Sequence, residues 1–236
     1  MPDESAVCRK DFESIDKIPL SPLAPGEMGV LMARAGAGKT ACLTHLAIGH
    51  LLRDEPVLHV CVDNVPDKVK LWYRELLKNL FANQPDCDVP GLQHKIEPLR
   101  FIMSFMNQTF SPGKLEQGFE NLKQQANFTP SLLIVDGLDF DRNDRAVFEQ
   151  IRDIARRQSV RVWISARMHR HISEVNERGI PYPVDKIDDL FGSILMLEPE
   201  GENVRLKILK HNENYNPVNS DLLLDPQTFL LVKKPV

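Results

Sequence analysis

The chain has 236 residues, 42% of them hydrophobic, which suits one globular domain with a sizeable core. Its formal net charge of −4 argues against a generally basic nucleic-acid-binding protein, although a local basic patch is compatible with it. The chain contains no apolar run of the about 18 residues that a membrane-spanning helix needs, and its cysteines form no C-x-x-C pair, so we expect a cytoplasmic protein with reduced thiols.

Segment 1–27 is rich in proline and is expected to be an irregular lead-in to a single domain over residues 28–236. Apolar strands and amphipathic helices then alternate along the chain. We predict strands at 29–32, 57–62, 99–105, 131–136 and 160–165, with helices at 41–52, 66–80, 115–126 and 147–155. Residues 82–97 are polar and interrupted by proline and glycine, so we predict a loop there.

Strands that alternate with helices indicate a parallel sheet that is covered by helices on both faces. After residue 190 the pattern changes to strands joined by turns, at 193–197, 204–209, 222–224 and 229–232. We therefore predict an α/β fold with a mostly parallel central sheet, flanking helices and C-terminal antiparallel strands.

A phosphate-binding motif lies at the junction of the first strand and the first helix. Residues 33–40 read Ala-Arg-Ala-Gly-Ala-Gly-Lys-Thr and match the pattern G-x-x-x-x-G-K-[ST] at every fixed position except the first. Small residues let backbone N–H groups surround a phosphate, the lysine reaches the terminal phosphates and the threonine hydroxyl binds Mg²⁺. The residues expected to hold ATP are Ala33, Arg34, Ala35, Gly36, Ala37, Gly38, Lys39, Thr40 and Ala41.

Asp136 ends an apolar strand about a hundred residues after this loop. Nucleotide-binding α/β proteins place at such a strand end the acid that holds Mg²⁺ through water. We predict a Mg²⁺ site at Thr40 and Asp136; the alternative is that Asp136 only caps the following turn.

These motifs resemble the RecA-like P-loop ATPases, most closely the DnaB-type helicases and the KaiC-type ATPases. The DnaB-type loop also tends to carry alanine and then arginine, where Ala33 and Arg34 stand. The resemblance extends over roughly residues 20–232, with matching segments in order at 62–67, 132–136, 162–165, 186–197 and 204–210. It implies a RecA-like domain that binds ATP with Mg²⁺ and forms a homo-oligomer, such as a ring of six.

The first departure from the family concerns catalysis. The resemblance places a glutamate, the base that polarises the attacking water, where Asn64 stands, with Asp63 beside it. An amide cannot accept a proton as a carboxylate does, so we expect slow hydrolysis. Asp63 could substitute, although strand alternation would point it to the opposite face. Asn64 has an equally good alternative role as the N-cap of the next helix.

The second departure concerns the strand that ends at Lys210. In the family this strand often ends in a lysine and an arginine that reach a neighbouring subunit's nucleotide, whereas here Asn212 stands in place of the arginine. Lys210 is therefore either a trans-acting catalytic charge or a solvated lysine at a strand end.

Arginines and histidines concentrate in residues 156–178. In the family, loops after this strand face a central channel, so nucleic acid is a candidate partner. Scattered surface charge is the competing interpretation, and the pair His169 and His171 lacks a third metal ligand.

Three functions remain open on the sequence alone. The first is an oligomeric regulatory or motor ATPase, the second a nucleotide-gated binding module without effective hydrolysis, and the third a DNA- or RNA-associated recombination or helicase accessory protein. Asn64 and Asn212 favour the second over the first, whereas the 156–178 region favours the third.

Overall fold

The structure is a computed structural model that describes residues 23–106, 108–172, 174–215 and 218–233. The expected lead-in over 1–27 lies mostly outside these residues. Its described end is part of the domain, because Leu23 is buried and the carbonyl oxygen of Leu23 accepts a hydrogen bond from Arg161.

One nine-stranded sheet organises the molecule, with the strand order β3-β2-β4-β5-β1-β6-β7-β8-β9. The six strands from β3 to β6 in this order are parallel, and β6 to β9 are antiparallel. The predicted α/β fold is therefore confirmed. The strand bounds are β1 Met28–Arg34, β2 Val57–Val62, β3 Arg100–Phe105, β4 Leu132–Asp136, β5 Arg161–Met168, β6 Ser193–Glu200, β7 Asn203–His211, β8 Val218–Leu224 and β9 Leu231–Lys233.

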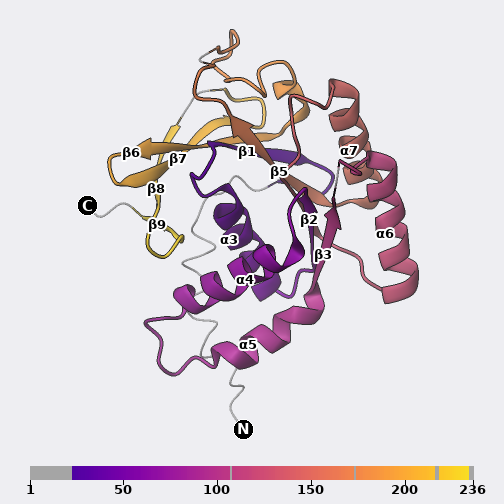
Figure 1. Ribbon diagram of the computed structural model, residues 1–236, viewed down its shortest axis with the longest axis vertical. Helices are drawn as coiled ribbons and strands as arrows, with labels where there is room; N and C mark the ends of the chain where they lie inside the picture. Colours follow the sequence, from indigo (N-terminus) through magenta and orange to yellow (C-terminus); the bar gives the residue numbers. More distant parts are fainter. Residues whose placement is uncertain (1–22, 107, 173, 216–217, 234–236) are drawn as a thin grey trace.

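Helices cover both faces of the parallel part of the sheet. Helices α3 and α4 lie on one face and α6 and α7 on the other (Figure 1). Each face has its own apolar core, because side chains of alternate strand residues point to opposite faces. The helix bounds are α3 Lys39–Leu52, α4 Pro66–Leu80, α5 Val89–Ile96, α6 Pro112–Ala126 and α7 Arg145–Gln158, with short 3-10 turns at η1 Glu97–Leu99 and η2 Asp188–Leu190.

Local sequence explains where several helices begin. The side chains of Ser111 and Asp144 each accept a hydrogen bond from a backbone N–H in the first turn of α6 and α7, respectively. In α4 and α6 a proline occupies the first turn, where its missing N–H costs nothing.

The loop predicted over 82–97 is wrong in its second half, which forms α5. Asp88 caps this helix by accepting a hydrogen bond from the N–H of Gly91, and Pro90 lies in the first turn. The proline and glycine that suggested a loop are therefore helix-start residues. The expectation of reduced thiols is also wrong for Cys87, which is disulfide-bonded, whereas Cys42 and Cys61 are free and buried.

Among the described residues, no helix combines the length and the apolar character that crossing a bilayer requires.

Candidate functional site

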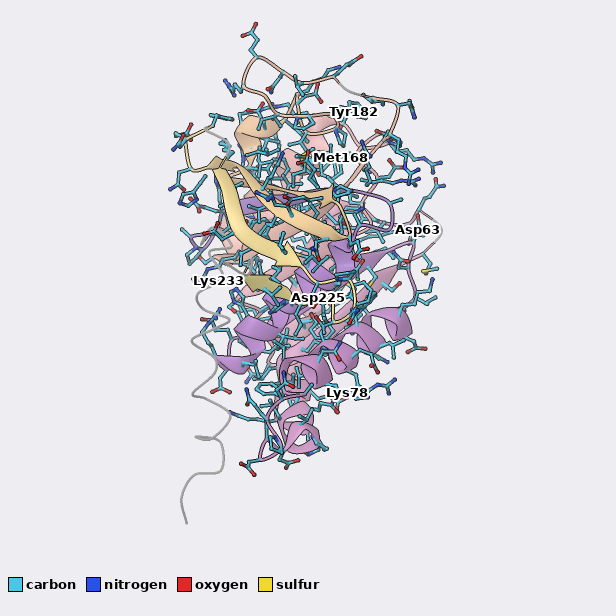
Figure 2. All side chains as sticks on the ribbon, turned by 90° about the vertical axis from the view of Figure 1, so that its left-hand side faces the viewer. Asp63, Lys78, Met168, Tyr182, Asp225 and Lys233 are labelled. Carbon is cyan, nitrogen blue, oxygen red and sulfur yellow. The ribbon has the colours of Figure 1, made fainter. Side chains whose placement is uncertain are left out.

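A cavity of about 460 Å³ opens where β1, β2, β4 and β5 end. These strands are parallel, so their carboxyl ends meet at one edge of the sheet, where ligands of open α/β sheets bind. Figure 2 labels Asp63, just after β2, and Met168, the last residue of β5. The lining residues are Ala35, Lys39, Thr40, Val62, Asp63, Asn64, Asp136, Gly137, Leu138, Asp139, Phe140, Asp141, Ser165, Arg167 and His169.

The loop between β1 and α3 has the conformation that the phosphate-loop motif requires. Gly36 and Gly38 have φ angles of 79° and 93°, a region that disfavours residues with a side chain. A Cβ atom on Gly38 would also lie 2.3 Å from Leu224 Cδ2. The loop leads directly into the first turn of α3, whose free N–H groups form an anion-binding end.

Ala33 differs from the glycine of the motif without disturbing this loop. It belongs to β1 and is fully buried, so its methyl group packs in the apolar core on the α3 face. The one mismatch to the motif therefore lies in the strand, and the phosphate-binding backbone after it is unaffected.

Lys39 is held over the loop by two backbone contacts. Its Nζ donates to the carbonyl oxygens of Ala33 and Arg34, each at 3.1 Å. Burial lowers the pKa of Lys39, while the carboxylate of Asp136 raises it and the charge of Arg167 lowers it further. The ammonium thus lies in a partly desolvated cavity, where a bound anion gains more than it would in water.

Thr40 and Asp136 meet although 96 residues separate them. Thr40 Oγ1 donates a hydrogen bond to Asp136 Oδ2 at 2.6 Å. Beyond Asp136, the N–H of Gly137 donates to Ser165 Oγ at 2.9 Å, which fixes the turn after β4 against β5. A Cβ atom on Gly137 would lie 2.5 Å from the carbonyl oxygen of Val62, so only glycine fits.

Asp63 and Asn64 both line the cavity, which corrects the expectation that they face opposite ways. Strand β2 ends at Val62, and Asp63 has a φ angle of 53°, so the alternation of the strand stops there. Asp63 Oδ1 accepts a hydrogen bond from the N–H of Gln108. Asn64 is not an N-cap, because Val65 precedes α4 and no side chain caps it.

Three further residues join the cavity that sequence reasoning assigned to a channel loop or an acidic turn: Arg167, His169 and Asp141. Asp141 accepts a hydrogen bond from Tyr182 and pairs with His169 Nε2 at 2.8 Å. These bonds hold the pKa of Asp141 below its usual value. The signal in the sequence was their position just after β4 and at the end of β5, the strands that flank the phosphate loop.

The charges of the cavity suit a divalent cation. Four aspartates line it against one lysine and one arginine. Mg²⁺ is commonly bound through one or two carboxylates together with phosphate oxygens and water. The donor set of Thr40 and Asp136 at the loop therefore fits this ion.

Lys210 lies away from this cavity and is 2% exposed. Its Nζ donates to the carbonyl oxygen of Asp188 at 3.0 Å and lies 4.7 Å from the centre of the Tyr215 ring. This geometry matches neither of the two predicted roles, because the ammonium is not exposed at a strand end.

The basic region 156–178 is divided by the fold. Arg157 pairs with Glu116 at 2.6 Å, and Arg178 pairs with Asp188 at 2.8 Å. Arg161 donates to the backbone of Leu23, and Arg167 lines the cavity. The arginines therefore form no continuous basic surface among the residues that the structure describes.

Comparison with known proteins agrees with the geometry. A family model described as "AAA domain" matches residues 25–171. A solved structure of the ATPase domain of a DnaB-family helicase is similar over 99% of each chain, with a TM-score of 0.65 and 14% sequence identity. No curated protein matches the chain. The structural likeness confirms the RecA-like ATPase fold.

Proposed function

Because the chain belongs to the AAA domain family of P-loop ATPases, we propose that it binds ATP with Mg²⁺ in the cavity beside Lys39 and hydrolyses it slowly. One observation carries the proposal. The phosphate loop, Lys39, Thr40 and Asp136 converge on a single cavity at the carboxyl edge of the sheet.

Each of these residues has a distinct task in binding. The backbone N–H groups at the start of α3 face the phosphates, and Lys39 supplies a full positive charge beside them. Thr40 Oγ1 and the carboxylate of Asp136 would hold Mg²⁺. When bound, Mg²⁺ neutralises phosphate charge and orients the terminal phosphate.

We infer that Asp63, rather than Asn64, acts on the attacking water. Asp63 offers a carboxylate at the end of β2 and is exposed to the cavity, with one oxygen engaged by Gln108. Its side chain is one methylene shorter than the glutamate that the resemblance implies. Proton transfer over a longer reach is weaker, which favours slow turnover.

A nucleotide-gated binding module is the second candidate. Asn64 supports it, because its amide lines the cavity near Gly137 and cannot serve as a base. In this function ATP binding would change the surface near the cavity and hydrolysis would be negligible. The rate of ATP turnover separates the two candidates.

Self-association and nucleic-acid binding stay predictions. Lys210 gives no support to an active site shared between subunits, because its ammonium is enclosed by its own chain. Of the basic region, Arg170 is exposed and outside the cavity lining, which leaves little charge for a nucleic-acid backbone.

The test is ATP turnover of the full chain with and without single-stranded DNA, with molecular mass measured in the same buffer. Slow, Mg²⁺-dependent turnover that DNA leaves unchanged supports the regulatory ATPase. Binding without turnover favours the gated module, and strong stimulation by DNA favours the nucleic-acid role. An absence of both binding and turnover contradicts all three.

A further inference from the structure

Arg167 occupies a position that no part of the proposed function has used. It lies on β5, next to β1, and its Cα is the register partner of Ala33, the first residue of the phosphate-loop motif. Its side chain is exposed and lines the same cavity as Lys39, Thr40 and Asp136. The fold itself therefore delivers an arginine to the phosphate end of the cavity.

The guanidinium of Arg167 has no hydrogen bond or ion pair with any residue that the structure describes. The other arginines of this region that turn back onto the protein, Arg157 and Arg178, have carboxylate partners. Arg167 instead lies close enough to Lys39 to lower the pKa of that lysine. Two cations that repel each other beside a phosphate loop are stabilised when an anion lies between them.

We propose that Arg167 contacts the terminal phosphate of ATP bound to its own chain and supplies in cis the charge that the resemblance assigns to a neighbouring subunit. This inference rests on the proposed function. A guanidinium can donate two parallel hydrogen bonds to a phosphate, which gives it a geometry that lysine lacks. It would reach the γ-phosphate of ATP and find no such partner in ADP.

The first experiment measures the affinities of ADP and of a non-hydrolysable ATP analogue, both with Mg²⁺. We expect Arg167→Ala and Arg167→Gln to weaken binding of the analogue by about tenfold or more and to leave ADP binding nearly unchanged, since a charge-assisted hydrogen bond contributes about 1.5–3 kcal/mol. Arg170→Ala is the matched control, because it removes the same charge three residues later, outside the cavity lining. The melting temperature without nucleotide checks that the variants fold.

The second experiment separates a cis from a trans contact. Arg167→Ala chains are mixed with Lys39→Ala chains, which keep Arg167 but lose the phosphate lysine. A cis arginine predicts that mixing restores no turnover, at any protein concentration. Turnover recovered in the mixture would overturn the cis assignment.

The outcomes distinguish this inference from the proposed function. If wild type binds both nucleotides and the Arg167 variants keep the same preference for the ATP analogue, the inference fails and the proposed function stands. If wild type binds neither nucleotide, the proposed function fails first.

Discussion

Thr40 Oγ1 and Asp136 Oδ2 are joined by a 2.6 Å hydrogen bond that links the first turn of α3 to the end of β4. Both oxygens are ligands that suit Mg²⁺, directly or through water. The two motifs that the sequence identified separately are therefore parts of one site.

Asp136→Asn is expected to remove the dependence of ATP binding on Mg²⁺. The amide keeps the shape of the side chain but loses the charge that attracts the ion. Titrations of ATP with Mg²⁺ and with a chelator measure the effect. Asp139→Asn is the control, because Asp139 lines the same cavity while its carboxylate accepts from the N–H of Asp141 and pairs with Arg142. Equal Mg²⁺ dependence in Asp136→Asn and wild type would remove Asp136 from the metal site.

Asp63→Asn is expected to lower kcat by about 10²–10⁴-fold, the usual contribution of a general base, with little change in ATP affinity. The amide can still accept the N–H of Gln108, so the loop should keep its place. Asp67→Asn serves as the control, since Asp67 is exposed on α4 and outside the cavity lining. Single-turnover kinetics give the rate. An unchanged kcat would show that another group acts on the water.

Asn64→Glu is expected to raise turnover above wild type, because it places a longer carboxylate in the same cavity. The measurement is steady-state phosphate release, with Asn64→Gln as the uncharged control of equal length. A wild-type rate already at tens per second would contradict the premise that the base is weak here.

Gly137→Ala is expected to destabilise the fold by more than about 1–2 kcal/mol, the cost of a left-handed conformation for a residue with a Cβ. Its φ angle is 97°, and the added methyl would press on the carbonyl oxygen of Val62. Gly113→Ala is the control, because no atom lies within 4 Å of its added Cβ, at the start of α6. Urea unfolding of both variants measures the difference, and equal midpoints would contradict the packing described for β2 and β4.

Two buried histidines are expected to make the protein less stable in acid. Burial lowers the pKa of His45 and of His59 to about 4 in the folded state. The unfolded chain binds their protons below about pH 6.5, so the stability is fully present above this pH and falls as the pH is lowered, by up to about 1.4 kcal/mol per unit for each histidine.

Urea unfolding at pH 7.5, 6 and 5 tests this dependence. His45→Asn should flatten it, because an amide oxygen can replace His45 Nδ1 as the acceptor for the N–H of Leu231 without gaining a proton. The same slope in this variant and wild type would assign the acid sensitivity to other groups.

Periodicity and motifs predicted the strand–helix alternation, the antiparallel end of the sheet and the meeting of Lys39, Thr40 and Asp136. They did so because a buried strand and a phosphate loop leave local patterns. The same patterns could not place Asp63, because its left-handed backbone after β2 breaks the alternation on which the prediction relied.

Lys210 and Arg167 were misplaced for a different reason. Whether a charged side chain at a strand end faces solvent or its own chain depends on residues far away in sequence. Tyr215 and the loop carrying Asp188 enclose Lys210, and the register of β5 with β1 brings Arg167 to the phosphate loop. Neither relationship has a local signature.

Calorimetric titration of wild type and Lys39→Ala with Mg·ATP tests the central claim most directly. Lys39 is the one full charge that the loop itself directs at the phosphates, so we expect saturable binding at one site in wild type and none in the variant. At a hundredfold excess over Kd, the ligand should also stabilise wild type by about 2.7 kcal/mol. Wild type that binds no Mg·ATP, or a Lys39→Ala variant that binds it equally well, would contradict the account.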